Sequence, residues 1–117
     1  VDDSLVRGTT SGSLVNIIRE AGASEVHVRI ASPPVRFPCY YGIDMPTKEE
    51  LMGHRLTIPQ IEAHLKVDSL GYLSLEGMEE AAKEGGPFCN ACFSGEYPAP
   101  LVDLDKGLIN PGDVKCC

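Results

Sequence analysis

The chain opens on a short stretch, VDDSLVRGTTSGSL, in which acidic, glycine and hydroxyl residues precede an apolar pattern with helical spacing. This is the order of a strand end, a turn and a helix, and ligands of α/β proteins bind in loops of this kind. Gly8 permits a close backbone turn, and the hydroxyl residues at 9–11 add donors beside a helix N-terminus, which suits a phosphate. Asp2 and Asp3 suit ribose hydroxyls or Mg²⁺. The alternative is an exposed turn with an ordinary helix cap.

The cysteines are a second group with potential chemistry. There are five: Cys89 and Cys92 form a C-x-x-C in PFCNACFSG, Cys39 lies in FPCYYG, and Cys116 and Cys117 end the chain. In a cytoplasmic protein this spacing favours metal or redox chemistry over structural disulfides. The residues alone leave three possibilities open: an iron–sulfur cluster, a zinc site completed by a histidine, or buried or free thiols.

Composition limits the classes of protein that fit. The chain has 117 residues, 43% apolar and 23% charged, which is typical of one small soluble domain. No apolar run approaches the roughly 18 residues of a membrane span, and the N-terminus shows no secretory signal, so a cytoplasmic location is expected. The net charge of −7, with only ten scattered Lys and Arg residues, argues against nucleic acid as a partner. A small anionic ligand remains compatible with this charge.

The elements that must position these residues follow an α/β order. Helical spacing predicts an amphipathic helix over 12–21, ended by Gly22. Its expected buried residues are Leu14, Ile17, Ile18 and Ala21. Strict alternation then predicts a strand over 25–30 with one buried face. The residues of that face are Val26, Val28 and Ile30.

Capping boxes mark the later helices. Thr47 with Glu50 predicts a short helix over 48–54, and Thr57 with Gln60 predicts a second one that begins at about residue 58. A third helix is expected over 75–83, with Ser74 as its N-cap and the glycines at 85 and 86 at its end. The chain beyond residue 92 is rich in proline and reads as loop.

Five segments of the chain resemble one known family. VDDSLVRGTTS resembles the phosphoribosyl pyrophosphate (PRPP) motif of type I phosphoribosyltransferases, in the form typical of amidophosphoribosyltransferases. REAGASEVHVRIASPP, CYYGIDMPTKEEL, DSLGYLSLEGM and CNACFSGEYP resemble later segments of that family, in the same order. The resemblance covers residues 1–98. It implies the C-terminal portion of a type I phosphoribosyltransferase fold, a parallel sheet with flanking helices that is incomplete in this chain, followed by an unassigned C-terminal tail at 99–117.

The resemblance also implies an activity. Enzymes of this family are pentosyltransferases that transfer glutamine-derived ammonia to PRPP, giving 5-phosphoribosylamine, pyrophosphate and glutamate in the first step of de novo purine biosynthesis. The implied partners are purine nucleotide effectors and further copies in a homo-oligomer. Nothing in the chain resembles the family's glutaminase domain or the N-terminal half of its phosphoribosyltransferase domain, so the fragment alone is expected to be inactive and to hold no catalytic residue. The alternative is a non-catalytic phosphoribosyl- or nucleotide-binding module with a structural metal site.

The resemblance assigns roles by position. Asp2 and Asp3 match the acidic pair that binds Mg²⁺ and the ribose hydroxyls of PRPP, and Ser4 lies between that pair and the 5-phosphate loop. The residues of this chain that match the family's 5-phosphate loop are Arg7, Gly8, Thr9, Thr10 and Ser11. Three of the four ligands of a [4Fe-4S] cluster, found in one branch of the family, match Cys39, Cys89 and Cys92. The fourth lies upstream of Val1 in the family, so here it is either missing or replaced by one of the two terminal cysteines.

Overall fold

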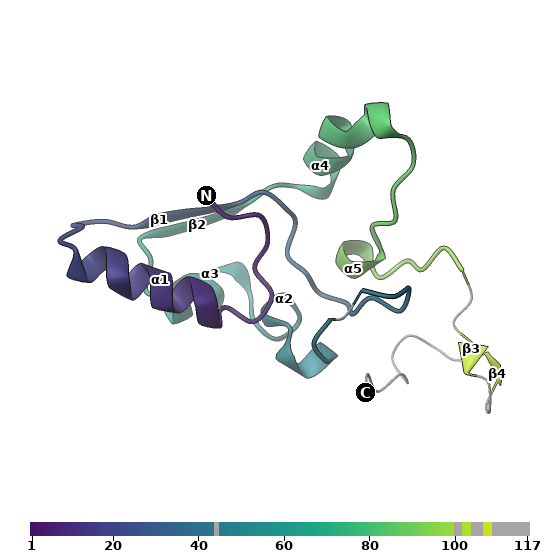
Figure 1. Ribbon diagram of the computed structural model, residues 1–117, viewed down its shortest axis with the longest axis horizontal. Helices are drawn as coiled ribbons and strands as arrows, with labels where there is room; N and C mark the ends of the chain where they lie inside the picture. Colours follow the sequence, from purple (N-terminus) through teal and green to yellow (C-terminus); the bar gives the residue numbers. More distant parts are fainter. Residues whose placement is uncertain (44, 100–101, 104–106, 109–117) are drawn as a thin grey trace.

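The structure is a computed structural model and describes residues 1–43, 45–99, 102–103 and 107–108. Its elements, in chain order, are α1 (Thr9–Glu20), β1 (His27–Ile30), the 3₁₀ turn η1 (Lys48–Glu50), α2 (Met52–Arg55), α3 (Ile58–Leu65), β2 (Ser69–Tyr72), α4 (Leu75–Ala82), the 3₁₀ turn η2 (Lys83–Gly85), α5 (Ala91–Ser94), β3 (Val102–Asp103) and β4 (Gly107–Leu108). Helices α1 and α3 lie together on one side of the β1–β2 pair, while α4 and α5 extend away from it (Figure 1). The α/β class predicted from the sequence is confirmed.

The sheet is parallel, and the first residues of the chain join it. In the β1–β2 register, His27 lies opposite Ser69 and Ile30 opposite Tyr72. Asp2 forms a parallel bridge to Ile30: its amide donates to the Arg29 carbonyl at 3.0 Å, and its carbonyl accepts from the amide of residue 31 at 2.9 Å. The N-terminal segment therefore runs along β1 on the side opposite β2. The loop that begins at Asp3 leaves the sheet at the carboxyl end of this segment, as its sequence predicts.

One apolar core holds these elements together. Its buried members come from the loop, α1, the strands, α2 and α3: Leu5, Val15, Val26, Ile30, Met52, Ile61, Leu65, Val67 and Leu70. Ile61 of α3 is fully buried, as is Leu51 at the start of α2. Because Leu5 belongs to the same cluster, the candidate ligand loop is anchored directly to the core.

The predicted buried face of the first helix is wrong. Leu14, Ile17 and Ile18 are 52%, 61% and 38% exposed, whereas Val15 is 2% exposed. The helix also begins at Thr9, three residues before its predicted start. It meets the core along the narrow line that contains Val15, and no element of the described residues packs over its broader apolar face. The pattern correctly marks an amphipathic helix but cannot say which of its apolar residues this chain covers.

The capping signals located the later helices well. Both boxes form, at Thr47–Glu50 and at Thr57–Gln60. The helix predicted over 48–54 is split, however, because Leu51 has an extended backbone (ψ 115°) and a fully buried side chain between η1 and α2. Ser74 caps α4 by accepting a hydrogen bond from the Gly77 amide at 3.0 Å.

Three shorter features differ from the prediction. β1 is limited to His27–Ile30 rather than 25–30. Strand β2 was not predicted, because Gly71 weakens its pattern; Arg29 lies across Gly71, and an added Cβ would lie 3.0 Å from the Arg29 Cδ. The single-turn helix α5 is not predicted, and its last two residues lie in the segment beyond residue 92 that the sequence indicates as loop.

The C-terminal tail predicted at 99–117 falls mostly outside the described residues, as do Cys116 and Cys117. Its described part includes β3 and β4, which pair antiparallel. In the part of the chain that the structure describes, no helix has the length and apolar character needed to cross a membrane.

Candidate functional site

The loop at residues 2–11 forms a hollow of about 350 Å³ between the sheet and α1. Gly8 is the N-cap of α1, with a left-handed backbone (φ 79°, ψ −4°), and no side chain caps this end of the helix. The residues of the first helical turn, Thr9, Thr10 and Ser11, line the hollow. Amides of a helix's first turn have no partner within the helix, and the helix dipole is positive there. This arrangement suits a bound phosphate.

Gly8 is required by its surroundings as well as by its backbone. It is buried, and a Cβ at this position would lie 2.2 Å from the Met52 Sδ. The Met52 amide in turn donates to the Val6 carbonyl at 2.9 Å. The start of α2 therefore supports the loop from behind, by packing at Gly8 and by a backbone hydrogen bond at Val6.

The acidic pair lies at the edge of the same hollow. The Asp3 amide donates to Asp2 Oδ1 at 3.0 Å, and Ser4 Oγ donates to Asp3 Oδ1 at 3.2 Å. Both carboxylates are exposed, and all three residues line the hollow. Mg²⁺ in phosphate sites is commonly held by one or two carboxylates together with substrate phosphates, so two exposed carboxylates here fit that ion. The structure thus brings the predicted acidic and phosphate-loop residues into one place.

The Arg7 side chain, in the predicted phosphate loop, forms an ion pair with Glu50. Its Nε donates to Glu50 Oε1 at 3.1 Å. Hydrogen bonds from Thr47, and next the one from Arg7, hold the pKa of the Glu50 carboxyl below its ordinary value. The sequence indicated Glu50 only as a helix-capping residue, and no sequence signal connects it with a loop 43 residues away.

The cysteines lie on two segments that the structure brings together. The Arg36 and Phe37 amides donate to the Cys92 carbonyl at 2.9 and 3.0 Å, and the Tyr97 hydroxyl donates to the Pro38 carbonyl at 2.6 Å. The segment around Cys39 therefore packs against the segment that carries the C-x-x-C. Tyr40 and Tyr41 both pack against the Tyr97 ring, with centroids 5.0 and 6.0 Å away.

The neighbouring thiols influence the pKa of Cys92, but in the described part of the chain the three thiols are not arranged as a metal site. Burial raises the pKa of the Cys92 thiol, and the neighbouring thiols of Cys39 and Cys89 raise it further. All three are free; Cys89 is exposed and the other two are half-buried. Among the described residues, no three His, Cys, Asp or Glu side chains are arranged to hold a metal ion. Thiolates are the donors that iron–sulfur clusters take, so these three side chains have suitable chemistry for one.

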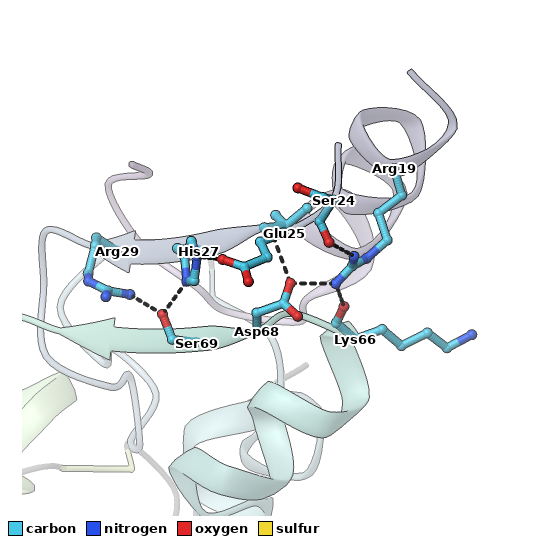
Figure 2. A network of polar contacts seen from close by, with 9 residues as sticks. Arg19, Ser24, Glu25, His27, Arg29, Lys66, Asp68 and Ser69 are labelled. Atoms are coloured by element: carbon cyan, nitrogen blue, oxygen red, sulfur yellow. Dashed lines mark hydrogen bonds and ion pairs between the residues drawn. The ribbon is translucent and has the colours of Figure 1, made fainter. Parts of the chain in front are cut away.

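A polar network fixes α1 and β1 to the segment before β2 (Figure 2). The Asp68 carboxylate accepts from Arg19 of α1 at 2.6 Å and from the Val26 amide at 2.7 Å. His27 is exposed, and its ring contacts Ser69 Oγ at 2.9 Å and Glu25 at 3.1 Å. These contacts lie within a structural network on the sheet and not in the hollow of the loop.

This network makes stability depend on pH. Hydrogen bonds from Val26 and then Arg19 hold the Asp68 pKa below its ordinary value. A carboxyl with a depressed folded pKa stabilises the fold above its unfolded pKa, about 3.8, and loses that contribution as the pH falls through the folded value. We expect the wild type to unfold at a higher urea concentration than Asp68→Asn. The difference between the two midpoints should stay constant from about pH 7 to 5 and become smaller below about pH 4. A difference that grows on acidification would contradict this reasoning.

The sequence of this chain was compared with those of known proteins. No family model matches the chain. The amidophosphoribosyltransferase of Drosophila melanogaster is 47% identical over 114 residues, which cover 88% of this chain and 21% of the relative. That of Synechocystis sp. is 54% identical over 104 residues, with the same coverage of each protein. The chain is homologous to one segment of the amidophosphoribosyltransferases. It spans about a fifth of the length of these relatives.

Solved structures of amidophosphoribosyltransferases share the fold of this segment. Glutamine PRPP amidotransferase from B. subtilis, complexed with ADP and GMP, gives a TM-score of 0.76 at 41% identity, covering 92% of this chain and 24% of that one. A structure described as the allosteric regulatory enzyme of purine biosynthesis gives a TM-score of 0.76 at 42% identity, with 94% and 24% covered. The parallel sheet and flanking helices are therefore part of a larger fold, as the sequence predicts.

Proposed function

We propose that this chain is the segment of an amidophosphoribosyltransferase that binds the ribose 5-phosphate part of PRPP. The observation that carries the proposal is the hollow at residues 2–11, where a helix N-terminus without a side-chain cap and two exposed carboxylates lie side by side. One end of the hollow suits a phosphate and the other suits Mg²⁺ and sugar hydroxyls. The homology to amidophosphoribosyltransferases supports the same assignment.

Each residue has a proposed part in binding. The 5-phosphate accepts hydrogen bonds from the backbone amides that follow Gly8 and from the hydroxyl groups at 9–11. Asp2 and Asp3 bind the ribose hydroxyls and Mg²⁺, and Ser4 holds the Asp3 carboxylate in place through its hydroxyl. Bound Mg²⁺ would neutralise charge on the pyrophosphate of PRPP.

The reaction that we propose for the whole enzyme is displacement of pyrophosphate from C1 of PRPP by ammonia. The new C–N bond forms as the C–O bond to pyrophosphate breaks, and the product is 5-phosphoribosylamine. Ammonia is released from glutamine, with glutamate as the second product, by a glutaminase domain that we place outside this chain. This chemistry depends on holding the electrophile in position, so the segment contributes by orienting PRPP.

We also propose that Cys39, Cys89 and Cys92 are ligands of a [4Fe-4S] cluster. The support is the donor chemistry and the packing of the two cysteine segments against each other. The fourth ligand comes from outside the described residues, and loading the cluster would deprotonate the Cys92 thiol despite its raised pKa. Such clusters and free thiols fit a reducing compartment, so we place the protein in the cytoplasm.

The proposed partners follow from the relatives. The B. subtilis amidotransferase was solved with ADP and GMP, so we propose purine nucleotides as effectors of the whole protein. We further propose that this segment packs against the glutaminase domain and the N-terminal half of the phosphoribosyltransferase domain within a homo-oligomer. These contacts would lie on surfaces such as the exposed apolar face of α1.

Removing one carboxylate tests the proposal. Asp3→Ala, made in the full-length protein that carries this segment, is expected to weaken Mg²⁺-dependent PRPP binding about 10-fold or more in calorimetric titration, because a charged contact of this kind contributes about 1.5–3 kcal/mol. Glu84→Ala, an exposed carboxylate away from the hollow, is the control and should bind as the wild type does. Unchanged PRPP affinity in Asp3→Ala would refute the site, and binding without turnover by the wild type would favour the non-catalytic module.

A further inference from the structure

The two oxygens of the Glu50 carboxylate serve different parts of the molecule. Oε2 accepts hydrogen bonds from the Thr47 amide at 3.0 Å and from Thr47 Oγ1 at 3.1 Å, which completes the capping box of η1. Oε1 accepts from the Arg7 Nε at 3.1 Å, across 43 residues of sequence. One side chain therefore connects a helix cap to the phosphate loop.

The second capping box of the chain shows that the cap itself does not need both oxygens. At α3, the single amide oxygen of Gln60 accepts from the Thr57 amide at 2.8 Å and from Thr57 Oγ1 at 2.9 Å. An amide completes that box alone. The capping box therefore does not require Oε1 of Glu50, and this oxygen accepts a hydrogen bond from Arg7 instead.

Arg7 is the middle one of three consecutive loop residues that the η1–α2 segment holds. Val6 accepts a hydrogen bond from the Met52 amide at 2.9 Å, and Gly8 packs against the Met52 side chain. The contacts at Val6 and Gly8 are backbone and packing contacts. The ion pair at Arg7 is the side-chain contact of the set, and its members are 53% and 46% exposed.

We propose that Glu50 is a positioning residue for the 5-phosphate loop, and that it acts by holding Arg7 so that the turn at Gly8 presents the amides of α1 to the phosphate. This inference rests on the proposed function for the identity of the ligand. The contact by which Glu50 restrains Arg7 is present in the protein without ligand. The two can therefore be tested separately.

Glu50→Gln separates the two roles of the side chain. The amide oxygen can complete the capping box, as Gln60 does, but the amide nitrogen that replaces the second oxygen cannot accept from Arg7. In the full-length protein we expect the affinity for PRPP with Mg²⁺ to fall about two- to fivefold at low salt, the range of an exposed ion pair. The loss should shrink toward the wild-type value near 1 M salt. Amide hydrogen exchange of the peptide that covers residues 4–12 should be faster than in the wild type without any ligand.

Two controls isolate the effect. Thr47→Ala removes the hydroxyl from the same box and leaves Arg7 paired, so it should lower the thermal midpoint while PRPP affinity stays unchanged. Gln60→Glu adds a carboxylate to the box that has no loop contact, and it should change neither affinity nor loop exchange.

The outcomes distinguish this inference from the proposed function. Wild-type affinity and wild-type exchange at 4–12 in Glu50→Gln would overturn the positioning role, as would an equal affinity loss in Thr47→Ala. Absence of PRPP binding by the wild-type protein would instead refute the proposed function. In that case the exchange of the loop would still decide the role of Glu50.

Discussion

Replacing Gly8 with alanine is expected to lower the free energy of unfolding by about 2–4 kcal/mol and to abolish phosphate binding at the loop. Two costs add at this position. A non-glycine residue is strained at φ 79°, and its Cβ would lie 2.2 Å from the Met52 Sδ. Relief would have to come from a shift of the loop or of Met52, which belongs to the core. Urea unfolding and titration with PRPP measure the two effects.

Two other glycines of the same region separate the causes. Gly22 also has a positive φ (99°), but an added Cβ there would meet no atom within 4 Å, so Gly22→Ala should show only the backbone strain. Gly12 lies within α1, where the nearest atom to an added Cβ is 3.9 Å away, so Gly12→Ala should leave stability equal or raise it by about 0.5–1 kcal/mol. If Gly8→Ala were no more destabilising than Gly22→Ala, the proposed support of the loop by Met52 would be wrong.

Replacing Cys92 with alanine is expected to remove the proposed cluster. In the full-length protein prepared anaerobically, iron and acid-labile sulfide should fall from about four of each per chain to near zero, because a cluster of this kind needs four thiolate ligands. Cys92 lies at the contact between the two cysteine segments, where its carbonyl accepts hydrogen bonds from residues 36 and 37. Metal analysis with visible absorption measures the loss.

The terminal cysteines provide the matched control. A double replacement, Cys116→Ala with Cys117→Ala, should keep the full iron content if the fourth ligand lies outside this chain. Loss of iron in that variant would assign the fourth ligand to the tail. One zinc per chain and no iron in the wild type would contradict the cluster altogether, and would favour a site with three cysteines and a histidine.

The fold was predictable where the signals are local. Both capping boxes, the cap at Ser74 and the strand that ends at Ile30 depend on residues a few positions apart, and all four form. Strand β2 was missed because its identity depends on its pairing with β1 and on a glycine that makes room for Arg29. The buried face of α1 was assigned wrongly because the neighbouring elements, and not the periodicity of the helix, decide which of its apolar side chains are covered.

The candidate site was predictable to a similar extent. The hollow is built from ten consecutive residues, so its acids, glycine and hydroxyl groups were visible in the sequence, and the resemblance to amidophosphoribosyltransferases assigned their roles. The contacts behind the hollow come from residues 50 and 52, far along the chain. No spacing rule connects Glu50 or Met52 with this loop, and only the folded chain brings them together.

The most direct test of the proposed binding site at residues 2–11 is a crystal structure of the full-length protein with ribose 5-phosphate and Mg²⁺. We expect the phosphate at the backbone amides of residues 9–11, within the hollow at the start of α1, and the ribose hydroxyls and the metal beside Asp2 and Asp3. Ribose 5-phosphate bound at another surface, with the hollow of the loop empty, would contradict it.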